Sequence, residues 1–170
     1  ALQATHAALL AIGGWCPAGR ACQPLPRKVL LLPSGAGREV RAFRAAYPDA
    51  ALFACDLNAK YTRFVARTFN ATAIAGQTDP VAAATTLRAR TGGNLDVVWM
   101  GSFLTHLRSG AALAWLSAMR DLLSDRGVLM ASVCLEDGLA HHVALVLGEG
   151  CERLARLVGS GPEGAQMAGE

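Results

Sequence analysis

The chain lacks a long run of apolar residues, although 52% of its 170 residues are apolar. No stretch approaches the roughly 18 consecutive apolar residues that a transmembrane helix needs. The N-terminal stretch, Ala1 to Trp15, also lacks the basic region that precedes the apolar part of a secretory signal peptide. These absences predict a cytoplasmic protein with no membrane partner.

Charged residues are scarce as well, at 17% of the sequence, and Lys28 and Lys60 are its only lysines. The formal net charge of +3 arises from 16 basic and 13 acidic residues, which are spread along the chain without blocks. A nucleic-acid-binding domain usually gathers its basic residues on one face or along one helix. The sequence shows no such cluster, which argues against a nucleic-acid partner.

The sequence also lacks a cysteine or histidine framework. Its five cysteines are an odd, scattered set: Cys16, Cys22, Cys55, Cys134 and Cys151. Cys16 and Cys22 are separated by five residues, which is too far for the usual tight zinc knuckle, and no second pair completes a site. His141 and His142 are adjacent, so on one helix they would point about 100° apart. We expect reduced thiols, as in the cytoplasm, and no metal site.

What the chain does contain is most informative between residues 29 and 58, where two apolar runs flank a glycine turn and a helix-like stretch. The first run leads into the turn Pro33–Gly37, and the second ends at Asp56, nineteen residues beyond that turn. Open α/β sheets build nucleoside sites in this order, because glycines let the backbone approach the ligand and the acid binds ribose hydroxyls. The segment therefore predicts a nucleoside-binding site.

The rest of the sequence repeats the alternation of strand and helix. Strands are predicted at residues 29–32, 51–55, 71–75, 95–100 and 128–133, and helices at 4–12, 38–46, 80–90, 111–123 and 139–158, with one more after Asn58. Asn58 and Asp79 are expected N-caps, and Ser124 to Gly127 an expected turn. On the helix after Asn58, the inner face is expected to hold Tyr61, Phe64, Val65 and Thr68. Connections this short predict right-handed crossovers and hence a doubly wound parallel sheet.

Two kinds of nucleotide site fit the glycine turn poorly. A dinucleotide-binding turn has a third glycine, but the residues after Gly37 are Arg38, Glu39 and Val40. The phosphate loop of ATP-binding proteins is also missing, because no Gly-Lys-Ser/Thr follows the turn. An NAD-dependent oxidoreductase is therefore the less favoured alternative.

Residues 28–133 resemble a class I S-adenosylmethionine-dependent methyltransferase domain. The matching segments are VLLLPSGAG (29–37), LFACDLN (52–58), GQTDP (76–80), LDVVWMGSFLTHL (95–107) and LLSDRGVLMASV (122–133). The resemblance implies a Rossmann-like sheet of five parallel strands in the order 3-2-1-4-5. It also implies S-adenosyl-L-methionine as cofactor and methyl transfer to a small-molecule acceptor. The expected units are residues 1–27 as helix and Pro-rich loop, 28–158 as the methyltransferase-like domain and 159–170 as a flexible tail.

The resemblance also implies cofactor contacts at four places along the chain. The turn Pro33, Ser34, Gly35, Ala36 and Gly37 would lie against the methionine part of the cofactor. Asp56 would bind the ribose hydroxyls, Leu57 would pack on the adenine, and Thr78 and Asp79 would lie at the adenine edge. Met100, Gly101 and Ser102 would face the sulfonium and the acceptor. His106, the only imidazole near this site, is the candidate general base.

Several of these residues have a plainer interpretation that stays open. Asp56 and Asp79 could each cap the helix that follows, which is a common use of aspartate. Met100, at a strand end, could simply be part of the core. His106 could cap or pack against the start of the following helix instead of taking a proton.

Two departures from the family pattern motivate a second hypothesis, that of a non-catalytic scaffold or subunit with the same fold. The family usually has an acid, which helps to order the glycine loop, at the position of Leu31. Class I domains also add an antiparallel hairpin beside strand five, and no two further strands are evident after Val133. Strand five would then be an exposed edge. Either the chain is a fragment, or the helix at 139–158 or a partner, such as a second copy, covers that edge.

Overall fold

The computed structural model of the chain describes residues 25–134 and 140–141. Its elements follow one another as β1 (Lys28–Leu31), α2 (Arg38–Ala46), β2 (Ala51–Asp56), α3 (Ala59–Phe69), β3 (Thr72–Ala75), α4 (Pro80–Thr91), β4 (Leu95–Met100), the 3₁₀-helix η1 (Leu104–His106), α5 (Ser109–Arg120), β5 (Leu123–Ala131), β6 (Val133–Cys134) and β7 (Ala140–His141). Within these residues, no helix is both long enough and apolar enough to cross a membrane.

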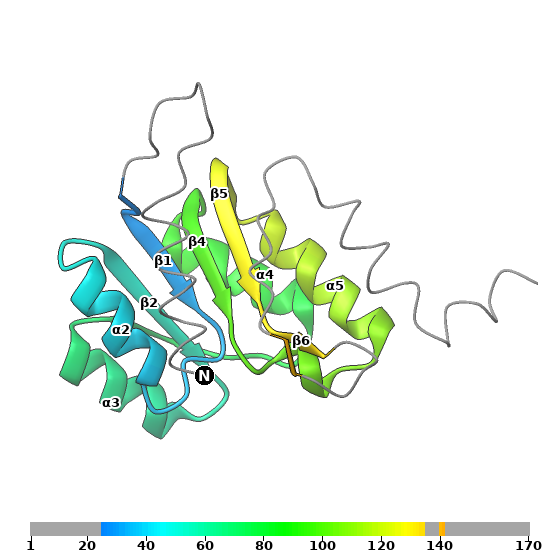
Figure 1. Cartoon of the computed structure of the whole chain (residues 1–170), viewed down its shortest axis with the longest axis horizontal. Helices are drawn as coiled ribbons and strands as arrows, with labels where there is room; N and C mark the ends of the chain where they lie inside the picture. Colours follow the sequence, from blue (N-terminus) through cyan, green and yellow to red (C-terminus); the bar gives the residue numbers. More distant parts are fainter. Residues whose placement is uncertain (1–24, 135–139, 142–170) are drawn as a thin grey trace, which may run out of the picture.

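The first five strands form one parallel sheet in the order β3-β2-β1-β4-β5 (Figure 1). This order confirms the predicted topology. It arises because the chain starts in the middle of the sheet, builds outward through β2 and β3, and then crosses to the other side of β1. The carboxyl ends of β1 and β4 therefore become neighbours at the point where the strand order reverses, which is where open α/β sheets bind ligands.

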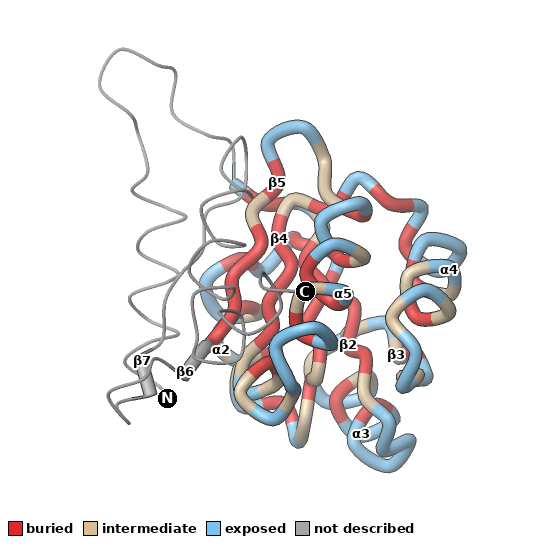
Figure 2. Tube along the Cα trace, turned by 90° about the vertical axis from the view of Figure 1, so that its right-hand side faces the viewer, coloured by how far each residue is buried: buried red, intermediate tan, exposed pale blue. Residues whose placement is uncertain are grey.

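The sheet is covered by helices on both faces, and alternate residues of β1 divide between the two cores. Val29 and Leu31 pack on the side of α2 and α3, together with Phe43 and Val65. Leu30 packs on the opposite side, in the cluster that includes residues of α4 and α5. Strands buried on both faces are expected in a doubly covered parallel sheet. Figure 2 shows this arrangement as buried strands with exposed outer faces on the helices.

The predicted helix boundaries hold where capping residues define them. Asn58 accepts a hydrogen bond from the Lys60 backbone N–H at 3.0 Å and so caps α3. Asp79 does the same for α4, accepting from Ala82 N–H at 2.8 Å. The bounds of α2 and β4 agree with the prediction residue for residue. The cap interpretation of Asp79 is thus confirmed.

The predicted inner face of α3 is wrong in most of its members. Tyr61 and Phe64 are 44% and 53% exposed, and Thr68 is exposed too. The buried residues of α3 are Thr62 and Val65. The aromatic side chains follow the same three-to-four spacing as the buried ones, but one position earlier, which is a rotation of about 100° around the helix. Hydrophobic periodicity alone selected the wrong stripe.

The C-terminal part of the sheet also differs from the prediction. α5 ends at Arg120, and β5 begins at Leu123, five residues before its predicted start. The expected turn at 124–127 is an irregularity inside β5, where the register with β4 shifts between Leu95 and Val97. Gly127 allows it, because a Cβ at this position would lie 2.5 Å from the Leu95 carbonyl oxygen.

The expectation that no strands follow strand five is corrected by a short antiparallel ladder. β6 and β7 pair Val133 with His141 and Cys134 with Ala140 in a two-stranded sheet of their own. Ala140 and His141, predicted to be helical, therefore lie on a strand. β5 pairs with β4 only, within the residues the structure describes. The other residues predicted as the helix at 139–158, the helix at 4–12 and the tail from 159 lie outside the described residues.

Candidate functional site

The glycine turn lies between the ends of two neighbouring strands. The Leu32 N–H donates to the Trp99 carbonyl at 2.9 Å, and the Ser34 N–H donates to the Cys55 carbonyl at 2.8 Å. These bonds extend the sheet ladders beyond Leu31, the last residue of β1. The turn is thereby held over the edge where β1, β2 and β4 end.

Gly37 is the glycine that the turn most strictly requires. Its φ of +88° is a left-handed conformation, and its N–H donates to the Ser34 carbonyl at 3.1 Å to close the turn. A Cβ here would lie 2.7 Å from the Phe69 ring and 2.9 Å from a Val65 methyl. Gly37 therefore both reverses the chain and lets α2 begin directly against α3.

We expect Gly37→Ala to destabilise the fold by about 1–3 kcal/mol, since a left-handed alanine costs about 1 kcal/mol or more and the new methyl group adds a clash. Thermal unfolding would show this as a lower melting temperature. Gly110→Ala is a matched control, because a Cβ at Gly110 meets nothing within 4 Å. An unchanged melting temperature for Gly37→Ala would contradict the role assigned to this glycine.

Asp56 connects the glycine turn to the loop after β2. One carboxylate oxygen accepts from Gly35 N–H at 2.9 Å, and the other accepts from Asn58 N–H at 2.8 Å. Each oxygen keeps a further acceptor site, so the carboxylate can still bind ligand hydroxyls. Leu31, in contrast, is fully buried. Leu31 stands where the family usually has an acid that helps to order the glycine loop. In this chain, the Asp56 carboxylate holds that loop through Gly35 N–H.

Cys55, just before Asp56, is a buried core residue and not a nucleophile. Burial, and secondarily the neighbouring Asp56 carboxylate, raise the pKa of the Cys55 thiol to about 12. Reactive cysteines need a lowered pKa and access to solvent, because the thiolate is the reactive form. The Cys55 thiol therefore stays protonated at neutral pH.

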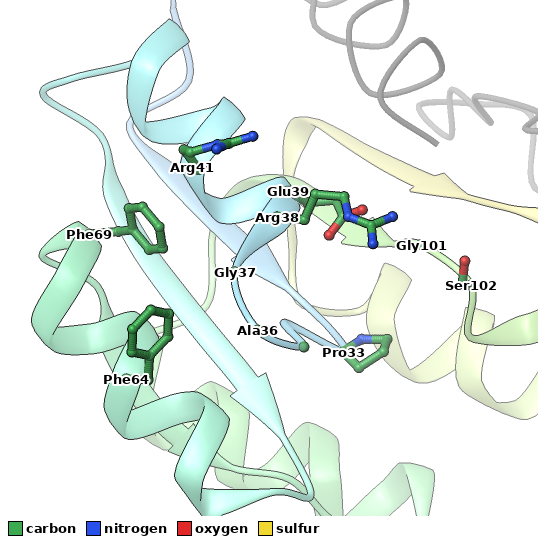
Figure 3. A pocket seen from close by; sticks show the side chains of 11 residues that line it. Pro33, Ala36, Gly37, Arg38, Glu39, Arg41, Phe64, Phe69, Gly101 and Ser102 are labelled. Carbon is green, nitrogen blue, oxygen red and sulfur yellow. The ribbon is translucent and has the colours of Figure 1, made fainter.

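A pocket of about 550 Å³ opens beside the glycine turn (Figure 3). Five of the predicted cofactor-binding residues and Ala36 of the same turn line it: Pro33, Gly35, Ala36, Gly37, Gly101 and Ser102. Five residues that the sequence did not point to complete the lining: Arg38, Glu39, Arg41, Phe64 and Phe69. The structure thus brings the turn after β1 and the turn after β4 to one cavity.

The other predicted residues lie outside this lining. Leu57 is 67% exposed and Thr78 is exposed, whereas Met100 is fully buried in the core on the side of α4 and α5. Ser34 is 1% exposed, and its hydroxyl has no hydrogen-bond partner within the described part of the chain. Met100 can therefore contribute only its backbone to a ligand, while Leu57 offers an open apolar surface.

The turn after β4 is held by a hydrogen bond to Ser132, the residue that follows β5. Ser102 has a positive φ of 53°, and its N–H donates to the hydroxyl of buried Ser132 at 2.6 Å. Strained residues held by their surroundings often occur at functional sites.

His106 follows on η1 as an exposed residue whose backbone N–H donates to the Phe103 carbonyl. His106 is near the site in sequence but does not line the pocket.

No protein-family model and no curated protein matches the sequence. Solved structures do match the fold. The plantazolicin methyltransferase BpumL, in complex with a pentazolic desmethylPZN analog and SAH, has a TM-score of 0.61 at 12% identity over 79% of this chain and 48% of its own. PKMT2 from Rickettsia typhi in complex with AdoHcy has a TM-score of 0.52 at 19% identity over 74% and 24%. A putative O-methyltransferase from Nostoc punctiforme has 0.56 at 19% over 77% and 36%.

The likeness to these methyltransferases confirms the fold expected from the sequence. The chain has the class I S-adenosylmethionine-dependent methyltransferase fold, with its strand order 3-2-1-4-5. It spans less than half the length of each of these three proteins. At sequence identities of 12% and 19%, the likeness shows the fold alone. Activity therefore has to be argued from the site itself.

Proposed function

We propose that this chain binds S-adenosyl-L-methionine at the glycine turn and catalyses methyl transfer to a small-molecule acceptor. The observation that carries the proposal is the hydrogen bond from Gly35 N–H, on a residue that lines the pocket, to the Asp56 carboxylate at 2.9 Å. It places an acid with free acceptor capacity beside the glycine turn, although Asp56 itself lies outside the pocket lining. SAH or AdoHcy in the solved neighbours supports the same ligand.

Residues of the glycine turn, which line the pocket, and residues after β2 and β3, which lie outside its lining, would fit the parts of this cofactor. Asp56 would accept hydrogen bonds from the two ribose hydroxyls, and Leu57 would pack on the adenine. Thr78 and Asp79 would border the adenine edge, where Asp79 has one carboxylate oxygen engaged as the cap of α4. The Pro33–Gly37 turn would lie against the methionine part. Within the described residues, no three His, Cys, Asp or Glu side chains could hold a metal.

The cofactor supplies the activated methyl group of a sulfonium, so the protein's work is to orient the acceptor and exclude water. Gly101 and Ser102, across the pocket from the α3 aromatics (Figure 3), would position the acceptor's reactive atom. Ser132 supports this geometry by fixing the Ser102 backbone. An oxygen or nitrogen acceptor also has to lose a proton, and His106, on η1 after the β4 turn, is the imidazole that would take it.

The proposal is tested by isothermal titration calorimetry with S-adenosylmethionine, S-adenosylhomocysteine and NAD. We expect saturable binding of the first two and none of NAD. Binding of NAD alone would favour the oxidoreductase alternative, although the missing third glycine argues against that alternative. Absence of binding by all three ligands would leave the non-catalytic scaffold as the better hypothesis.

A further inference from the structure

The pocket contains charged side chains that have no role in the argument so far. Arg38 and Glu39 form the first two positions of α2, and both line the pocket. The structure records no ion pair for either side chain among the residues it describes. In Figure 3 both lie on the side of the glycine turn that faces Ser102, whereas Phe64 and Phe69 lie on the other side.

Helix stability explains one of these residues and not the other. A carboxylate in the first turn, such as Glu39, interacts favourably with the helix dipole, and a cation there is unfavourable. Arg38 therefore has no stabilising reason to stand at the start of α2, and it has no acidic partner in the described structure. Arg38 is exposed and lines the pocket, so a negatively charged group of a ligand there could reach its guanidinium.

The two side chains together complement a zwitterion. A guanidinium matches the planar geometry of a carboxylate through paired N–H donors, and a carboxylate accepts from an ammonium group. The only zwitterionic part of S-adenosylmethionine is its α-amino-acid end. That end belongs to the methionine part, which lies against the Pro33–Gly37 turn in the proposed function.

We propose that Arg38 and Glu39 bind the amino-acid end of the cofactor, with Arg38 donating to the α-carboxylate and Glu39 accepting from the α-ammonium. This assignment rests on the proposed function. Glu39 would then supply the negative charge near the methionine part, which the buried Leu31 does not provide. Arg41, one turn further along α2, lies farther from Ser102 in the view of Figure 3 and is not part of the pair.

The experiment compares two nucleoside thioethers that differ in the amino-acid group. S-adenosylhomocysteine carries this group, whereas 5′-methylthioadenosine has the same adenosine and sulfur without it. We expect Arg38→Gln and Glu39→Gln each to weaken binding of S-adenosylhomocysteine about tenfold, as loss of one charge-assisted hydrogen bond would. Affinity for 5′-methylthioadenosine should stay within about twofold, since that ligand does not reach the pair. Arg38→Lys, which keeps the charge but loses the planar fork, should fall in between.

Arg63→Gln is the matched control, because Arg63 is an exposed arginine of α3 outside the pocket lining. It should leave both affinities unchanged, and melting temperatures should show that all variants are folded. Wild-type affinity of Arg38→Gln and Glu39→Gln for S-adenosylhomocysteine would overturn this assignment and leave the proposed function intact. Equal losses for both ligands would overturn it as well. Failure of the unmodified chain to bind either ligand would instead contradict the proposed function, and the assignment with it.

Discussion

Asp56→Ala is expected to weaken binding of S-adenosylhomocysteine by about tenfold to a thousandfold, since it removes charge-assisted hydrogen bonds to two ribose hydroxyls. The substitution should also lower stability, because Gly35 N–H and Asn58 N–H both lose their acceptor. The first effect would be measured by calorimetry and the second by thermal unfolding. The α3 cap itself would remain, because the Asn58 side chain supplies it, so the loss of stability would come from the bonds to Gly35 and Asn58 N–H.

Asn58→Ala separates the two effects of Asp56. It removes the α3 cap, in which the Asn58 side chain accepts from Lys60 N–H at 3.0 Å, but leaves the Asp56 carboxylate in place. A lost cap costs about 1 kcal/mol of stability. We therefore expect a lower melting temperature with nearly unchanged affinity. If Asp56→Ala behaved in the same way, with lost stability and retained affinity, Asp56 would be a structural residue and the ribose assignment would fail.

Much of the fold could be predicted because local signals and tertiary packing agree. The N-caps Asn58 and Asp79 mark where α3 and α4 begin, and the apolar run of β4 has no other use than the centre of a sheet. The errors occur where two patterns compete. On α3 the aromatic stripe with Tyr61 and Phe64 has helical spacing, but the smaller Thr62 and Val65 face the sheet. Residue size and the space left by α2 decide this, and periodicity does not report either.

Some features of the candidate site could be predicted from the sequence, and others could not. Backbone features could be predicted, since glycine at Gly35 and Gly37 and an acid after β2 have few alternative explanations in this order. Side chains that complete the pocket could not. Helical periodicity predicts a core position for Phe64, and nothing in the sequence marks Arg38 as a pocket residue. Arg38 follows Gly37 directly in the sequence, but only the fold brings Phe64 to the glycine turn, because α2 and α3 pack side by side on the same face of the sheet.

Arg44 joins that pair of helices at the C-terminal end of α3. Its guanidinium donates to four backbone carbonyls: Phe69 at 3.0 Å, Pro48 at 2.7 Å, Ala50 at 2.9 Å and Asn70 at 2.9 Å. The first and last of these lie at the C-terminal end of α3, and the other two lie in the loop between α2 and β2. One side chain thus closes both loops, using the fork of donors that only arginine has.

We expect Arg44→Ala to lower the free energy of unfolding by about 2–4 kcal/mol, because it removes four hydrogen bonds, two of them to the part-buried carbonyls of Phe69 and Ala50. In a domain of this size the melting temperature should fall by about 4–16 °C. Arg44→Lys should recover only a minor part, since an ammonium group cannot reach carbonyls on both loops at once. The affinity of the folded protein for S-adenosylhomocysteine should change little, because Arg44 does not line the pocket and bonds only the backbone carbonyl of the lining residue Phe69. A melting temperature equal to that of the unmodified chain would mean that water replaces these bonds without loss. A large fall in affinity would mean instead that Arg44 sets the geometry of the pocket by holding Phe69, which lines the pocket beside Gly37.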